Sequence, residues 1–365
     1  MTRLPVMALL AVVLPGMAAE IDRYFKVPAK FRGDFGDYRS VLMFNNGDPV
    51  KTPADWKKRR AEILENWHSR MGRWPTLVKD HQLEVLATKR RDGNITQKQV
   101  RFRWTPTEKM TGYLLIPDGK GKRPAVITVF YEPETAIGEG SRPLRDFAIQ
   151  LARRGFVTLS IGTTETTKNR TYATYWPTRE NAKVQPLSML ACGSANAWHL
   201  LAKQPEVDSK RIGITGHSYG GKWSMFASCL YEKFACTAWS DPGIVFDTRG
   251  SVNYWEPWYL GYAPPPWRKR GRVTETNPAT GLYPKLLKEG MDLHELHALM
   301  APRPFLVSGG SEDGPHRWQA LNRTLEVYDL LGVKNRVAMT NRPMHSPTEE
   351  SNEVIYQFFE RFLKP

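Results

Sequence analysis

The stretch Ile212-Gly213-Ile214-Thr215-Gly216-His217-Ser218-Tyr219-Gly220 decides the fold of this chain. Residues up to Thr215 are typical of the end of a buried strand, and we expect a helix from Gly220 onward. A sharp turn between them holds the serine in a strained conformation, and the positions two residues away on either side must be small for the turn to close. The stretch therefore predicts that Ser218 is a nucleophile presented at the end of a strand.

The sequence on both sides of this turn alternates between strand and helix patterns. We predict strands at 83–87, 99–104, 112–116, 124–130, 156–161, 211–215, 235–239, 304–308 and 336–340. We predict helices at 142–154, 186–203, 220–231, 318–331 and 348–363, and a surface helix that follows Thr52-Pro53. The first three strands have the pattern of an antiparallel entry sheet, and the later alternation predicts an α/β fold: a mostly parallel, doubly wound sheet with helices on both faces.

The remaining segments suggest how the chain is divided. We expect a signal peptide at 1–18, an N-terminal extension with the surface helix at 19–80, and a catalytic domain at 81–365. Within that domain, about 242–300 is rich in Pro, Trp and Tyr and lacks clear periodicity. Long segments of this kind often form a lid or a substrate platform beside an active site.

The N-terminus has the features of an export signal. Arg3 supplies positive charge, residues 4–14 form a short apolar run, and Gly16-Met17-Ala18 offers small residues for cleavage. The run is too short to span a bilayer, and no later stretch reaches the roughly 20 apolar residues that a membrane helix needs. We therefore expect a protein without a membrane span, delivered to the periplasm or secreted.

Composition limits the classes of protein and of partner. With 365 residues, 41% of them hydrophobic, the chain can bury a large core, which excludes a disordered or fibrous protein. A net charge of +15 favours anionic partners such as an acidic polysaccharide, a nucleic acid or a membrane surface, and the charge alone does not choose among them. No nucleic-acid motif is found. The three cysteines, Cys192, Cys229 and Cys236, can form at most one bridge.

A serine nucleophile needs a base and an acid that orients the base. His345 follows the last predicted strand, where this architecture delivers its histidine, and His316 is a weaker second candidate. His294 and His297 lack the spacing of a zinc-binding helix and are interpreted as structural. The chemistry requires neither a metal nor an organic cofactor.

Two aspartates compete for the role of the acid. Asp313 follows the strand at 304–308 and is preferred because the acid usually lies at that strand end. Asp241 follows the strand after the serine and is the second candidate, with a turn cap before Pro242 as its structural interpretation. Glu312 is a third option. The sequence leaves the choice open because burial beside the histidine cannot be read from it.

The oxyanion of an acyl-transfer reaction would lie at the start of the helix after Ser218. The Tyr219 amide can donate a hydrogen bond there, and a helix N-terminus favours negative charge. The second donor is not identified, because Phe130-Tyr131-Glu132-Pro133 stands where many α/β-hydrolases have His-Gly-Gly.

With these positions in hand, the chain resembles the carbohydrate esterases of the α/β-hydrolase superfamily, and most of all the glucuronoyl esterase family. That family's turn reads Gly-Cys-Ser-Arg-x-Gly-Lys, and four positions match, namely Gly216, Ser218, Gly221 and Lys222. The run from Asp292 to Pro304 resembles its Asp-x-His-x-Leu and Ala-Pro-Arg-Pro motifs. Further matches are Trp56, Arg59, Arg60, Gly72 and Pro75.

The resemblance implies an α/β-hydrolase fold and roles for individual residues. It implies that Ser218 is the nucleophile and His345 the base, while Asp241 and Asp313 match acid positions of different members. It also implies that Lys222 binds the hydroxyls of a sugar acid, with a surface lysine as the alternative. Trp255 and Trp258 resemble the family's aromatic segment and would stack on sugar rings, with packing of the insertion as the alternative.

Two departures from the family bear on the substrate. Tyr219 replaces the arginine of the family's oxyanion site, and the stretch from Asp241 to Tyr254 is shorter than its counterpart. We predict a serine esterase that acts on polysaccharide-linked esters and resembles glucuronoyl esterases. The alternatives are an acetyl xylan esterase or glycan deacetylase, a serine peptidase, and a catalytically inactive carbohydrate-binding homologue.

Overall fold

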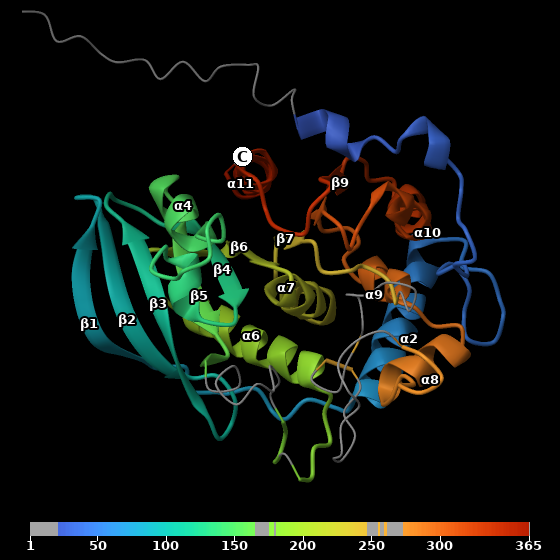
Figure 1. Cartoon of the computed structure of the whole chain (residues 1–365), viewed down its shortest axis with the longest axis horizontal. Coiled ribbons are helices and arrows are strands. Elements are labelled where there is room, and N and C mark those ends of the chain that lie inside the picture. Colours follow the sequence, from blue (N-terminus) through green and yellow to red (C-terminus); the bar gives the residue numbers. More distant parts are fainter. Residues whose placement is uncertain are drawn as a thin grey trace, which may run out of the picture.

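A computed structural model of the chain describes residues 21–164, 175–178, 180–246, 255, 259–260 and 273–364. In these residues the strands form one nine-stranded sheet in the order β1-β2-β3-β5-β4-β6-β7-β8-β9 (Figure 1). The strands are β1 Leu83–Arg91, β2 Ile95–Arg103, β3 Lys109–Pro117, β4 Arg123–Phe130, β5 Val157–Gly162, β6 Val207–His217, β7 Cys236–Ser240, β8 Phe305–Gly309 and β9 Val337–Asn341.

The sheet combines an antiparallel entry with a parallel body. The pairs β1–β2, β2–β3 and β3–β5 are antiparallel, and all the remaining pairs from β5 to β9 are parallel. The predicted antiparallel entry and mostly parallel, doubly wound sheet are confirmed. Parallel strands bring their carboxyl ends to one edge, so the segments that leave β6, β7, β8 and β9 meet there.

Helices cover both faces of the sheet (Figure 1). The helices are α2 Pro53–Met71, α3 Pro133–Ala136, α4 Phe147–Arg153, α6 Pro186–Ala202, α7 Tyr219–Leu230, α8 Leu282–Lys288, α9 Leu293–Ala298, α10 Trp318–Leu330 and α11 Glu349–Leu363, with short 3-10 turns η1 Asp22–Phe25, η2 Ala29–Phe31 and η3 Pro315–Arg317. One apolar cluster joins one face of the sheet to α2, α6, α7, α9 and α10. A second cluster joins the other face to α4 and α11.

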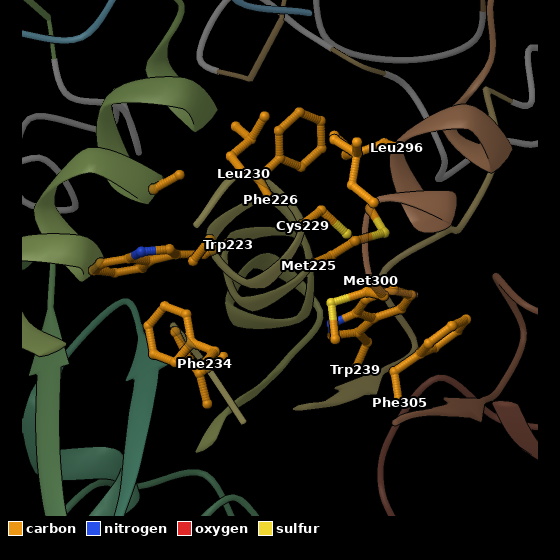
Figure 2. Packing of buried hydrophobic residues seen from close by; sticks show 14 of the residues in the cluster. Trp223, Met225, Phe226, Cys229, Leu230, Phe234, Trp239, Leu296, Met300 and Phe305 are labelled. Carbon is orange, nitrogen blue, oxygen red and sulfur yellow. The ribbon is translucent and has the colours of Figure 1, made fainter. Parts of the chain in front are cut away.

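The core behind the serine turn is built around α7. Figure 2 shows Trp223, Met225 and Phe226 of this helix facing the side chains of neighbouring elements. On the α9 side, Trp239 of β7 stacks on Phe305 of β8 with ring centroids 4.6 Å apart. Large buried aromatic groups stabilise by about 2 to 3 kcal/mol each, so α7 is held rigidly against the sheet.

Some predicted bounds differ from the structure. The helix expected at 142–154 is only the short α4, because Leu144 has a φ of +59° and Pro143 precedes it. The segment 242–300 contains the helices α8 and α9, which its lack of periodicity did not predict. The predicted signal peptide at 1–18 lies outside the described residues. In the part of the chain that the structure describes, no helix has the length and apolarity to cross a bilayer.

Candidate active site

Ser218 lies between the last residue of β6 and the first residue of α7, in a conformation that few residues adopt. Its φ of +57° and ψ of −111° are the strained geometry that the Gly-x-Ser-x-Gly pattern predicts. A Cβ on Gly216 would lie 2.5 Å from the carbonyl carbon of Gly220, and a Cβ on Gly220 would overlap the Val129 carbonyl oxygen. Both positions therefore require glycine for the turn to close.

Ser218, His345 and Asp241 form a continuous hydrogen-bonded chain. The Ser218 Oγ lies 2.8 Å from His345 Nε2, and His345 Nδ1 lies 2.7 Å from Asp241 Oδ2. His345 comes from the loop between β9 and α11, and Asp241 from the residue after β7. Of the two aspartates that the sequence offered, the structure places Asp241 against the histidine.

The Asp241 carboxylate is completely buried and is held by backbone amides as well as by the histidine. Its Oδ1 accepts hydrogen bonds from the amides of Gly310 at 2.6 Å and Asp313 at 3.1 Å. Asp241 has a φ of +47°, which turns its side chain toward the loop after β8. These donors supply hydrogen-bond partners to a carboxylate that is removed from water.

Asp313, the preferred acid from the sequence, faces the other way. Its carboxylate accepts hydrogen bonds from the amides of Gly243 at 2.8 Å and Ile244 at 2.7 Å, and it lies 3.7 Å from Arg317 Nε. Burial, and then the charge of Asp241, raise the pKa of the Asp313 carboxyl to about 6. Asp313 therefore holds the chain that follows Asp241 and does not contact His345.

Neither Glu312 nor His316 takes the place of Asp241 or His345 in this hydrogen-bonded chain, although the charge of His345 acts on Glu312. The Glu312 side chain is buried, its Oε2 has no hydrogen-bond partner among the described residues, and burial is the main cause that raises its pKa. His316 is exposed on η3. In the described residues, the imidazole that contacts Ser218 is that of His345.

Tyr219, whose amide was predicted to stabilise an oxyanion, is the first residue of α7. Its ring is buried and stacks flat on Tyr131, with ring centroids 4.7 Å apart and 6° between the planes. Tyr131 follows β4 directly, in the loop where the second oxyanion donor was sought. The stacked pair joins that loop to the helix N-terminus beside Ser218.

Comparison with known proteins identifies this architecture. The profile of the prolyl oligopeptidase family matches residues 194–314, which include the serine turn. A 4-O-methyl-glucuronoyl methylesterase from Phanerochaete carnosa is 21% identical over 98% of this chain and 89% of its own. The structure of a glucuronoyl esterase from Solibacter usitatus superimposes with a TM-score of 0.70 at 19% identity, over 93% of this chain and 100% of that one.

This chain has the α/β-hydrolase fold. A Bacteroides fragilis protein described as a candidate acetyl xylan esterase shares the fold, with a TM-score of 0.55 at 16% identity over 89% of this chain and 81% of its own. The named relatives and structural neighbours are therefore esterases, and the predicted resemblance to glucuronoyl esterases is confirmed. At these identities the structural likeness establishes the fold.

Two residues that the sequence assigned to sugar binding lie in the interior of this α/β-hydrolase fold. Lys222 is 7% exposed, so it is not a surface lysine; its Nζ donates to the Pro242 carbonyl and lies 4.7 Å from the centre of the Trp255 ring. Burial lowers the pKa of Lys222, whereas the charges of nearby carboxylates such as Glu312 act to raise it.

The prediction that Trp255 stacks on sugar is corrected, because the ring is fully buried against Phe226 and Phe246. Trp258 lies outside the described residues.

Arg342 is a residue of the site that the sequence did not indicate. It is 8% exposed, and its guanidinium donates to the His345 carbonyl at 2.8 Å and the Ser346 carbonyl at 2.8 Å. It also donates to the carbonyls of Ser308 at 2.8 Å and Gly309 at 3.2 Å. Arg342 thus ties the loop that carries His345 to the end of β8. No motif in the sequence surrounds it, so only its position three residues before His345 could have drawn attention to it.

Three further histidines, His217, His294 and His297, are buried, and burial favours their uncharged form. His217 Nδ1 lies 3.0 Å from Ser240 Oγ, and burial holds its pKa well below 6.5. The same cause lowers the pKa of His294 to about 4 and that of His297 well below 6.5. His294 and His297 lie on α9 in the core, in keeping with their structural interpretation. All three cysteines are buried and free, so the bridge that the sequence allowed is not formed.

Proposed function

We propose that this protein is an exported serine esterase that hydrolyses esters on polysaccharides, with a uronoyl ester as its first candidate substrate. The observation that carries the proposal is the hydrogen-bonded chain from Ser218 through His345 to Asp241. Such a chain activates a hydroxyl that is otherwise a weak nucleophile.

The first half of the reaction forms an acyl-enzyme. As Ser218 Oγ attacks the ester carbonyl carbon, its proton moves to His345 Nε2, and buried Asp241 stabilises the imidazolium through Nδ1–H. The carbonyl oxygen becomes an oxyanion next to the N-terminus of α7, where the Tyr219 amide lies. When the intermediate collapses, the carbon–oxygen bond to the alcohol breaks and His345 gives its proton to the leaving alcohol.

The second half repeats the same steps with water. His345 takes a proton from water, the hydroxide attacks the acyl carbon, and a second oxyanion forms at the same place. Collapse breaks the bond to Ser218 Oγ, which regains the proton from His345, and the free carboxylic acid leaves. The cycle consumes one ester and one water, and it requires no other reactant.

The nature of the substrate is supported by the relatives and by charge. The relative from Phanerochaete carnosa is named for removing methyl esters from 4-O-methyl-glucuronate. A net charge of +15 attracts an acidic polymer at long range, an effect that salt weakens. Buried Lys222 lies one turn after the serine on α7, so its charge acts on the same region.

A panel of defined esters tests the function. We expect turnover of a methyl glucuronate ester, and loss of roughly a millionfold in kcat for Ser218→Ala. Ser224→Ala is a matched control on the same helix, because the Ser224 hydroxyl only donates to the Gly221 carbonyl. Turnover that persists in Ser218→Ala would contradict the proposal. Labelling of Ser218 by an organophosphonate separates an active esterase from an inactive carbohydrate-binding homologue.

An acetyl xylan esterase is the second candidate, favoured by the likeness to the Bacteroides fragilis protein. Acetylated xylo-oligosaccharides in the same panel distinguish the two. Lys222→Met should lower turnover of the uronate ester more than turnover of the acetyl ester if the lysine acts on the acid sugar. Short peptide amides test the peptidase alternative, and N-terminal sequencing of exported protein tests cleavage after residue 18.

A further inference from the structure

Two arginines next to the active site have no carboxylate partner among the described residues. The Arg142 guanidinium lies 5.5 Å from the centre of the Tyr131 ring and 5.7 Å from that of Phe130. Arg145 donates to the Ser346 hydroxyl at 3.3 Å and to the Pro143 carbonyl at 3.0 Å, and its Nε is buried without a partner. Both side chains belong to the turn that leads into α4.

These arginines reach the reacting groups through two short connections. Arg142 lies over Tyr131, whose ring stacks on Tyr219, the residue after Ser218. Arg145 contacts Ser346, the residue after His345. The Arg142 guanidinium is therefore connected through two stacked rings to the residue after the nucleophile, and Arg145 directly contacts the residue after the base.

Among the described residues, Asp241 and Asp313 lie within the electrostatic field of Arg342, whereas no carboxylate pairs with Arg142 or Arg145. Burial lowers the pKa of Arg145, and the charges of Arg142 and Arg342 lower it further, which places three guanidinium groups within each other's field. Arginines elsewhere on the surface behave differently: Arg90, Arg101 and Arg153 each pair with a carboxylate. Unpaired like charges that are partly shielded from water repel one another, and an anion removes that repulsion.

We propose that Arg142 and Arg145 form a subsite that binds the carboxylate of an acidic sugar. The inference rests on the proposed function, because an enzyme that acts on uronate-bearing polysaccharide encounters sugar carboxylates both in its substrate and in its product. A guanidinium presents a planar fork of donors that matches a carboxylate, and the flat Tyr131 ring holds one of the two forks in place. Arg342 is excluded as a ligand, because its donors are occupied by backbone carbonyls.

The carboxylate has two sources with the same chemistry. Hydrolysis of a uronoyl ester releases a sugar carboxylate at Ser218, so the subsite would hold the product. A polysaccharide also carries uronates that are not esterified, and the subsite would then hold a neighbouring residue of the substrate. The experiment below includes a probe for each source.

Calorimetric titration of the full mature protein tests the subsite without relying on turnover. The probes are glucuronate, a xylo-oligosaccharide that bears a free glucuronate, and the neutral methyl β-glucoside, each at low and high salt. We expect glucuronate to bind more tightly than the glucoside, less so at high salt, and its Kd to rise at least fivefold in Arg142→Gln and in Arg145→Gln. Arg32→Gln is the control, because Arg32 is an exposed residue of the N-terminal segment with the same charge.

The outcomes separate the alternatives. Arginine-dependent binding of glucuronate alone identifies the product as the ligand, whereas arginine-dependent binding seen only with a xylo-oligosaccharide that bears a free glucuronate identifies the polymer. Equal affinity in wild type and both variants, for both acidic probes, overturns the proposal. Thermal melting of each variant verifies that it folds.

Ester turnover by wild type is measured in parallel. Absence of turnover with arginine-dependent binding would contradict the proposed function and leave the subsite. Turnover without arginine-dependent binding would contradict the subsite and leave the function.

Discussion

Asp241 Oδ2 lies 2.7 Å from His345 Nδ1, and the neighbouring Asp313 carboxylate points away from that ring to the amides of Gly243 and Ile244. Two buried carboxylates thus lie at adjacent strand ends with different partners. Asp241 contacts His345, the base of the proposed reaction, and Asp313 holds the chain that follows Asp241.

This difference predicts unequal effects of two matched substitutions. Asp241→Asn should lower kcat on the order of 10³- to 10⁴-fold at neutral pH, because an amide at Nδ1 favours the wrong tautomer of His345. Asp313→Asn should lower the free energy of unfolding by about 1 to 3 kcal/mol, since an amide cannot accept both backbone hydrogen bonds equally well. Steady-state kinetics and urea unfolding of both variants measure the two effects.

The opposite result would contradict the assignment of Asp241 as the acid. If Asp313→Asn lost as much activity as Asp241→Asn while keeping its stability, the acid of the reaction would be Asp313. If Asp313→Asn loses activity only in proportion to its loss of folded protein, the result supports Asp241 as the acid.

Arg342 is expected to act as a positioning residue. Its guanidinium binds the carbonyls of His345 and Ser346 on one loop and that of Ser308 on another, a span that lysine cannot bridge. Arg342→Lys should therefore lower kcat by roughly a hundredfold with little change in KM, because the imidazole is displaced while the substrate still binds.

Chemical rescue distinguishes positioning from a general loss of stability. Millimolar guanidinium chloride should restore part of the kcat of Arg342→Ala, because the free ion can occupy the vacated space. Arg336→Lys is the control at the opposite end of β9, where the guanidinium lies over the Phe362 ring. An effect of Arg336→Lys equal to that of Arg342→Lys, or a complete lack of rescue, would argue against this role.

Buried histidines predict how stability depends on pH. The pKa of His297 is held well below 6.5 by burial, and neither ring nitrogen has a partner among the described residues. Below pH 6.5 the unfolded chain binds a proton there that the folded chain does not, so stability present above 6.5 is lost as pH falls. Each such histidine contributes a loss of about 1.4 kcal/mol per pH unit.

His297→Phe isolates this contribution. The side chain packs against both Trp239 and Phe305, so a phenyl ring suits its surroundings. Urea unfolding at pH 8, 6 and 5 should show a smaller loss of stability between pH 6 and pH 5 in the variant than in wild type. His294, whose pKa is about 4, remains as an internal reference. The same slope in both proteins would show that His297 does not titrate on unfolding.

Local patterns made part of the candidate site predictable. The serine turn is specified by a buried strand, two glycines and a helix that are contiguous in sequence, and His345 follows from the order of elements. The choice of acid was not predictable in this way. Asp241 and Asp313 both follow parallel strands whose ends meet at one edge, and only the tertiary placement of the two loops shows that Asp241 is the one that contacts the histidine.

Features that depend on tertiary burial were the ones that the sequence did not reveal. Trp255 belongs to a segment with the aromatic composition of a sugar-binding platform, yet its ring packs against Phe226 and Phe246. Lys222 resembles an exposed residue of a first helical turn, but the chain after Asp241 covers it. Arg342 makes its contacts with backbone carbonyls, which leave no signature in the residue types around it.

The clamp made by Arg342 separates two tasks within one polypeptide. The histidine's loop is secured to the sheet through carbonyls alone, and carbonyls persist whatever side chains the surrounding positions carry. Substitutions at those positions can therefore change the side chains around the site without loosening the loop that carries His345, which leaves this part of the scaffold free to vary in sequence.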